Sequence, residues 1–134
     1  MRQRRVLIVE DSLATVDLAT FVLNAAGFAV QSAADVGSLI AQLLLFKPDL
    51  ILMDIQMPGM DGLELTRRLK TDPLTRHIVV VAFTAFAMSG DEAKMRAAGC
   101  DGYIAKPFDV ASFAATVHAH IHRRGDDDAK TALP

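Results

Sequence analysis

The chain has 134 residues, of which 51% are hydrophobic and 22% are charged, enough for one globular domain with its own core. Its 14 basic and 16 acidic residues give a net charge of −2, so no electrostatic basis exists for binding nucleic acid or an anionic membrane. No apolar run approaches the roughly 20 residues of a membrane span. The single cysteine, Cys100, excludes an internal disulfide and is typical of a reducing compartment. We therefore expect a cytoplasmic protein.

Short apolar runs alternate with helical patterns along the chain. The apolar runs predict strands at 6–9, 28–33, 50–53, 78–83 and 102–105. Helical patterns cover 12–26, 36–46, 63–70, 89–98 and 109 to about 123, with Ser12 and Asp109 as candidate N-caps. Residues 57–62 contain one proline and two glycines, which predicts a loop. Gly125 is expected to end the last helix, so that a domain over 1–124 is followed by a polar, disordered tail at 125–134.

Strand–helix alternation of this kind predicts an α/β fold, with a five-stranded parallel sheet covered by helices on both faces. Right-handed crossovers place the carboxyl ends of all the strands at one edge of the sheet. Glu10 and Asp11 follow the first strand, Asp54 ends the third, Thr84 follows the fourth and Lys106 follows the fifth. These five side chains should therefore meet at one edge.

Such a set has a definite chemistry. Carboxylates brought together repel one another unless a cation lies between them, and their hard oxygens suit Mg²⁺ better than zinc. Mg²⁺ commonly binds through one or two carboxylates and phosphate oxygens. Lys106 adds a cation, Thr84 a hydroxyl donor, and an aspartate can itself be the nucleophile of phosphoryl transfer. Taken one at a time, these residues could instead be helix caps or turn residues.

Four motifs then resemble a known family. They are Val-Glu-Asp at 9–11, Leu-Met-Asp-Ile-Gln-Met-Pro-Gly-Met-Asp-Gly at 52–62, Phe-Thr-Ala at 83–85, and Tyr-Ile-Ala-Lys-Pro-Phe at 103–108. In this order and spacing they resemble the response-regulator receiver domain, similar to chemotaxis regulators and more so to single-domain cell-division regulators. The resemblance covers nearly the whole chain. It implies a doubly wound, flavodoxin-like (βα)5 fold with strand order 2-1-3-4-5.

The resemblance implies roles at the phosphorylation site of a two-component phosphorelay. Asp54 would accept a phosphoryl group from a histidine on a kinase or phosphotransfer protein. Asp11, Asp54 and the backbone carbonyl of Gln56 would ligate Mg²⁺ (or Mn²⁺), and Glu10 would act through water.

Further roles concern the bound phosphoryl group and the response to it. Lys106, Thr84 and the Ala85 backbone N–H would hold the phosphoryl group. Thr84 and Tyr103 would form a switch, and the Lys106–Pro107 peptide would be cis.

Output would then depend on a partner protein. The resemblance implies that the partner reads the face built from the fourth helix, fifth strand and fifth helix, in a monomer or weak dimer. Ala87 and Met88 enter that face as small or apolar contacts. Leu18 and Phe21 fall outside the core stripe of the first helix, beside the sheet edge that carries Asp54, which suits docking of a partner helix. Phe21 could equally pack under a neighbouring helix.

Two other functions are alternatives to a stand-alone signalling module. One is a Mg²⁺-dependent phosphatase of the haloacid-dehalogenase type, which uses Asp-x-Asp; here the second position is Gln56, so the general acid is missing. The other is a receiver excised from a hybrid histidine kinase. Met1, shortly before the first strand motif, and the polar tail favour a stand-alone protein instead.

Two further features have plain interpretations. His118 and His122, four apart, share a helix face, as metal-binding pairs do, but without a nearby Cys, Asp or Glu an exposed helix face is favoured. Cys100 has no activating neighbour in sequence and is expected to be structural.

Overall fold

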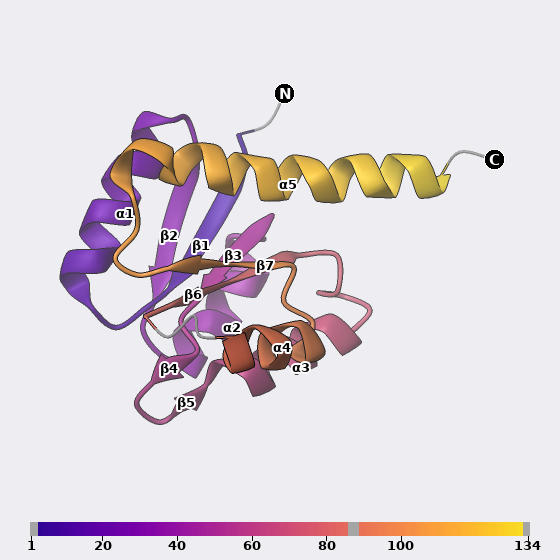
Figure 1. Cartoon of the computed structure of the whole chain (residues 1–134), viewed down its shortest axis with the longest axis horizontal. Coiled ribbons are helices and arrows are strands. Elements are labelled where there is room, and N and C mark those ends of the chain that lie inside the picture. Colours follow the sequence, from indigo (N-terminus) through magenta and orange to yellow (C-terminus); the bar gives the residue numbers. More distant parts are fainter. Residues whose placement is uncertain (1–2, 86–88, 133–134) are drawn as a thin grey trace.

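The computed structural model describes residues 3–85 and 89–132 of the chain (Figure 1). Five parallel strands form one sheet in the order β2-β1-β3-β6-β7. Their bounds are Arg5–Val9 for β1, Ala29–Ala33 for β2, Leu50–Met53 for β3, Val79–Thr84 for β6 and Gly102–Ala105 for β7. Because β4 and β5 belong to a separate hairpin, this order is the predicted 2-1-3-4-5, and the predicted fold class is confirmed.

Five helices cover the two faces of the sheet (Figure 1). On one face lie α1 (Leu13–Ala25) and α5 (Val110–Ala132); on the other lie α2 (Val36–Leu45), α3 (Gly62–Thr71) and α4 (Ser89–Ala98). Successive strand side chains point to opposite faces, so β1 contributes Val6 and Ile8 to the core under α1 and α5, and Leu7 and Val9 to the other core. Burial on both faces explains why the central strands are almost continuously apolar.

The first helix begins and packs as its sequence predicts. Ser12 is its N-cap, and the Ser12 hydroxyl accepts a hydrogen bond from the backbone N–H of Thr15. Ala19 and Leu23 are buried, and Val16 packs against the same core. This stripe fixes which side of α1 faces solvent.

The region between β3 and α3 differs from the predicted loop. Residues Gln56–Met57 (β4) and Met60–Asp61 (β5) form a two-stranded antiparallel hairpin, and α3 begins at Gly62. A turn of two residues, Pro58 and Gly59, joins the paired Met57 and Met60. Gly59 has φ +71°, a left-handed conformation that glycine adopts without strain.

The end of the chain also differs from the prediction. Helix α5 does not stop near Arg123 but continues through Gly125 to Ala132. A glycine in a helix interior costs only about 1 kcal/mol relative to alanine, and extending an existing helix avoids the cost of nucleating one. None of the helices in the described ranges combines the length and apolar character needed to cross a membrane.

Candidate functional site

The carboxyl ends of the five parallel strands meet at one edge of the sheet. The backbone N–H of Glu10 donates to the Ala33 carbonyl at 3.1 Å, and that of Asp54 donates to the Val9 carbonyl at 3.0 Å. The N–H of Lys106 donates in the same way to Thr84, at 2.8 Å. These bonds extend the parallel ladders one residue past the strand ends. They hold the polar residues in fixed register, as the alternation of strands and helices predicts.

Lys106 lies between two buried carboxylates at this edge. Its Nζ is 2.7 Å from Glu10 Oε2 and 3.3 Å from Asp54 Oδ2. Both carboxylates are at least 95% shielded from solvent, with Glu10 3% and Asp54 4% exposed. The same ammonium group lies 5.3 Å from the centre of the Phe83 ring, a cation–π contact from the side of the core. The ammonium group is therefore held by charge and by packing together.

Backbone donors orient the two carboxylates. Asp54 Oδ1 accepts from the Gln56 N–H at 2.9 Å, and Glu10 Oε1 accepts from the Ser12 N–H at 3.1 Å. Each carboxylate thus has one oxygen bound to the backbone and the other facing Lys106. Hydrogen bonds to ionised groups are the stronger kind, so this arrangement positions Asp54 before any ligand arrives.

Negative charge is in excess at this edge of the sheet. We call Glu10, Asp11 and Asp54 the acidic edge; one carboxylate oxygen from each lies within 4.8 Å of the other two. Burial raises the pKa of Glu10, and the charge of Asp54 adds to this, against the hydrogen bond from Lys106. Burial alone would lower the pKa of Lys106, but the hydrogen bond to Glu10 and the charges of both carboxylates raise it. One ammonium group does not balance three carboxylates.

The donor set therefore fits a hard divalent cation. All three side chains offer carboxylate oxygens, the ligands that Mg²⁺ and Mn²⁺ prefer. Asp11 is exposed, so the cluster opens to solvent on that side.

The start of α3, directly after the hairpin, packs against the backbone of Asp54. Met57 and Met60 are buried in the core under α2 and α3. A Cβ atom at Gly62 would lie 2.6 Å from the Asp54 carbonyl oxygen and 2.7 Å from Ile55 Cα, so only glycine allows α3 to begin this close. Reasoning from the sequence missed this support. The signal was present, because two residues with a glycine between apolar residues are typical of a hairpin.

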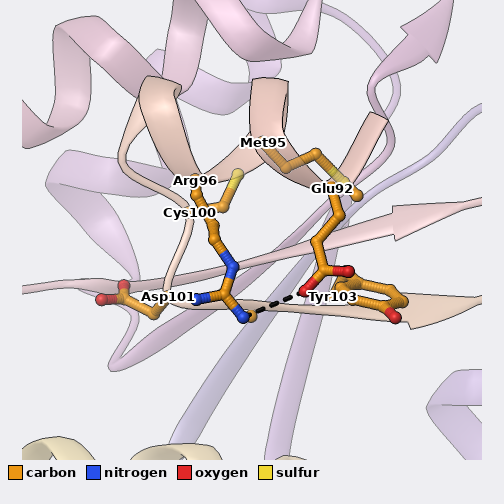
Figure 2. A pocket seen from close by; sticks show the side chains of 7 residues that line it. Glu92, Met95, Arg96, Cys100, Asp101 and Tyr103 are labelled. Atoms are coloured by element: carbon orange, nitrogen blue, oxygen red, sulfur yellow. Dashed lines mark hydrogen bonds and ion pairs between the residues drawn. The ribbon is translucent and has the colours of Figure 1, made fainter. Parts of the chain in front are cut away.

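The predicted switch residues lie on adjacent strands. Thr84 ends β6 and is 1% exposed, whereas Tyr103 on β7 is 40% exposed. Tyr103 lines a hollow of about 170 Å³ between α4 and β7. Figure 2 shows it next to the ion pair of Glu92 and Arg96. Tyr103 is therefore on the outer surface in this structure, one strand away from the buried hydroxyl of Thr84.

Two surfaces were predicted to contact partners. Leu18 is 45% and Phe21 73% exposed on α1, so Phe21 is not packed under a neighbouring helix. A hollow of about 210 Å³ runs between α1 and the turn after β7, and joins Leu18 to Lys106 and Pro107. Ala87 and Met88 lie outside the described residues. The Lys106–Pro107 peptide is cis, as the resemblance implied.

Comparison with known proteins gives the family. The sequence model of the response regulator receiver domain family matches residues 6–118. The match covers every strand of the sheet except the first residue of β1. The chain belongs to the response regulator receiver family. It is 41% identical over 118 residues to the polar-differentiation response regulator DivK of Brucella anthropi, covering 88% of this chain and 96% of the relative. The DivK protein of Brucella ovis is also 41% identical, over 121 residues, with the same coverage.

Solved structures of receiver domains have the same fold. A putative response regulator from Chloroflexus aurantiacus superposes with a TM-score of 0.83 at 28% identity, covering 90% of this chain and 99% of that one. A CheY-like receiver domain protein from Methanospirillum hungatei gives 0.84 at 26% identity, with 94% and 99% covered. This chain thus has the fold of both solved structures over nearly their whole length.

Cys100 and the histidine pair of α5 lie where their sequence context predicts. Burial raises the pKa of the Cys100 thiol, in spite of a hydrogen bond with Thr66, so Cys100 is poorly suited to act as a nucleophile. It packs against the core under α2 and α3. His118 and His122 share an exposed face of α5, as their spacing predicts.

Proposed function

We propose that this receiver domain, comprising residues 1–124, is a single-domain response regulator of a two-component phosphorelay. In this proposal Asp54 accepts a phosphoryl group from a phosphohistidine on a histidine kinase or histidine phosphotransfer protein. The observation that carries it is the state of the Asp54 carboxylate. It is buried at the end of β3, oriented by the Gln56 N–H at 2.9 Å, and 3.3 Å from a lysine ammonium group.

The proposed reaction is a substitution at phosphorus. A carboxylate oxygen of Asp54 attacks, an O–P bond forms, the P–N bond to the donor imidazole breaks, and its electron pair stays on the imidazole nitrogen. The product is an acyl phosphate on Asp54. The Gln56 N–H keeps the unreacted oxygen in place throughout.

Lys106 is proposed to change partners during this step. Before transfer its Nζ bonds Glu10 and Asp54. After transfer the charge of Asp54 has moved onto the phosphoryl oxygens, which attract the ammonium group in turn. Thr84 and the backbone N–H of Ala85 are proposed to donate to the other phosphoryl oxygens, because Thr84 ends and Ala85 follows β6, the strand next to β3.

The acidic edge is proposed to hold Mg²⁺ or Mn²⁺ through Asp11, Asp54 and the Gln56 carbonyl, with Glu10 acting through water. When bound, the cation would neutralise charge on the transferring phosphoryl group. The excess of carboxylates over ammonium groups supports this assignment.

The proposed output is a change in partner binding. If the Thr84 hydroxyl moves toward the phosphoryl group, it leaves space behind it on β6, and Tyr103 on the adjacent β7 is exposed enough to turn into that space. The hollow between α4 and β7 in Figure 2 would change shape with that rotation. The face formed by α4, β7 and α5 would then bind a downstream protein differently in the two states.

The phosphodonor is proposed to dock on α1. Leu18 and Phe21 are exposed apolar side chains, and the hollow beside Leu18 leads to Lys106. An apolar helix face that fills this hollow would place a donor histidine near the acidic edge.

A labelling experiment tests the proposal. Wild-type protein incubated with radiolabelled acetyl phosphate or a phosphohistidine donor, with Mg²⁺, should become labelled, and Asp54→Asn should not. Asp17→Asn, which alters an exposed carboxylate on α1, is the control for acetyl phosphate and should label normally. Undiminished labelling of Asp54→Asn would contradict the assignment.

A further inference from the structure

Two histidines on α5 are arranged like the ligands of a metal ion. His118 and His122 lie one helical turn apart, and both are exposed. Their Nε2 atoms are 3.0 Å apart, and their ring centres are 4.1 Å apart with the planes inclined at 48°. The two rings therefore point the same ligand atom at one position above the helix.

The separation of the nitrogen atoms suits coordination of one ion. Imidazole nitrogen binds Zn²⁺ at about 2.0–2.1 Å, so two such nitrogens on one ion at angles of roughly 90–110° lie about 2.8–3.4 Å apart. The observed 3.0 Å between the two Nε2 atoms falls within this range. A shared N–H···N hydrogen bond occupies the same geometry without metal, and an ion would replace its proton.

The His118 ring is supported from behind. The edge of Phe28 meets it with ring centres 6.5 Å apart and an angle of 68° between the planes. Phe28 is itself buried, and its backbone N–H donates to the Leu23 carbonyl at 3.0 Å. A ring with restricted motion loses less entropy when it binds an ion. His118 is thus the better ordered of the two ligands.

This pair is separate from the acidic edge. Helix α5 starts after the turn that follows Lys106 and runs back along the sheet, and His118 packs on Phe28, just before β2 begins. The pair therefore lies toward the amino ends of the strands, away from Asp54. His120 belongs to a different face, because a Cβ atom at Gly102 would lie 2.3 Å from His120 Cε1.

We propose that His118 and His122 form a bidentate site for a borderline divalent ion, namely Cu²⁺, Ni²⁺ or Zn²⁺, with water in the remaining positions. Imidazole nitrogens favour these ions, whereas the carboxylates of the acidic edge favour Mg²⁺ and Mn²⁺. The chain thus has two metal-binding regions of different chemical preference. Because the ion links adjacent turns of α5, its binding stabilises that helix.

Calorimetric titration of the full chain with CuCl₂, NiCl₂ or ZnCl₂ tests the site. Excess Mg²⁺ is present throughout to occupy the acidic edge. We expect one ion per chain, tightest for Cu²⁺, and a melting temperature that rises with Zn²⁺ and returns when EDTA is added. Loss of one ligand turns a chelate into a single imidazole, so His122→Ala and His118→Ala should each weaken binding by about 10²-fold.

His122→Ala is the decisive variant, and His77→Ala and Asp54→Asn are its controls. His122 is exposed, so His122→Ala should fold normally even if His118→Ala loses stability with its Phe28 contact. His77→Ala removes a single exposed histidine before β6 and should bind as tightly as wild type, and so should Asp54→Asn. Wild-type affinity in His122→Ala, or equal weakening in His77→Ala, would overturn the proposal. Failure of Asp54 labelling alone would leave it intact.

Discussion

Replacing Gly62 with alanine tests how the acidic edge is supported. The new Cβ atom would lie 2.6 Å from the Asp54 carbonyl oxygen and 2.7 Å from Ile55 Cα. Both are backbone atoms of the segment that joins β3 to the hairpin, so relief of the clash requires the chain to move. Overpacking of this kind costs about 1–3 kcal/mol, and backbone neighbours place Gly62 at the upper end of that range.

The expected net loss is smaller than the clash, because alanine is the better helix former. The gain over glycine at a helical position is up to about 1 kcal/mol, which leaves a net destabilisation of about 2 kcal/mol. For a chain of 134 residues, each kcal/mol lowers the melting temperature by about 3–4 °C. Gly62→Ala should therefore melt about 7 °C below wild type, by circular dichroism.

The same displacement should slow phosphorylation. Moving the Asp54 backbone disturbs the bond from Gln56, and a misplacement of about 1 Å can cost about 10²-fold in rate. Labelling by acetyl phosphate should fall by roughly 10–10²-fold.

A second glycine provides the control. Gly37 lies in α2, and a Cβ atom there would meet only Asp35 Oδ1, at 3.6 Å. Gly37→Ala should raise the free energy of unfolding by up to about 1 kcal/mol and leave labelling unchanged. Equal melting temperatures for Gly62→Ala and wild type, or equal losses in both variants, would refute the packing argument.

Three other predictions follow from the site. Mg²⁺ should raise the melting temperature of wild type, and Asp11→Asn should lose most of that shift; an unchanged shift would show that the ion binds elsewhere. Because the pKa of Glu10 is raised from 4.5 in the folded protein, the stability from its protonation is fully present below pH 4.5 and is lost as the pH rises through the folded-state pKa. Urea unfolding from pH 4 upward should therefore show a shallower decline for Glu10→Gln, and parallel curves would contradict the assigned direction. Phe21→Ser should reduce the rate of phosphotransfer from a donor protein with little change in melting temperature, because Phe21 is 73% exposed. Leu44→Ser, at 72% exposure on α2, should reduce neither, and lost stability with unchanged transfer in Phe21→Ser would exclude docking on α1.

Much of the fold could be predicted from local pattern. Buried parallel strands have continuous apolar runs such as 50–53, and glycine and proline residues mark most helix ends. The meeting of Glu10, Asp54, Thr84 and Lys106 followed from handedness alone, since all crossovers turn the same way. Their roles, by contrast, came from the family resemblance and stay proposals.

The errors have two physical causes. The prediction that Gly125 ends α5 assumed that a glycine terminates a helix. The free-energy cost of one glycine inside a helix is small compared with the cost of nucleating a new helix. The hairpin at 56–61 was missed because Pro58 and Gly59 were interpreted as loop residues, when two residues between Met57 and Met60 close a short ladder.

The sequence by itself determined the α/β class, the edge at which the polar residues meet and the hard-oxygen chemistry of that edge, because these depend on periodicity, handedness and residue type. Only the tertiary structure decided that Lys106 bridges Glu10 and Asp54, that Phe21 faces solvent and that His118 and His122 converge. Those facts depend on side-chain direction and, for Lys106 and Glu10, on a contact between residues 96 positions apart in the chain, and sequence periodicity specifies neither.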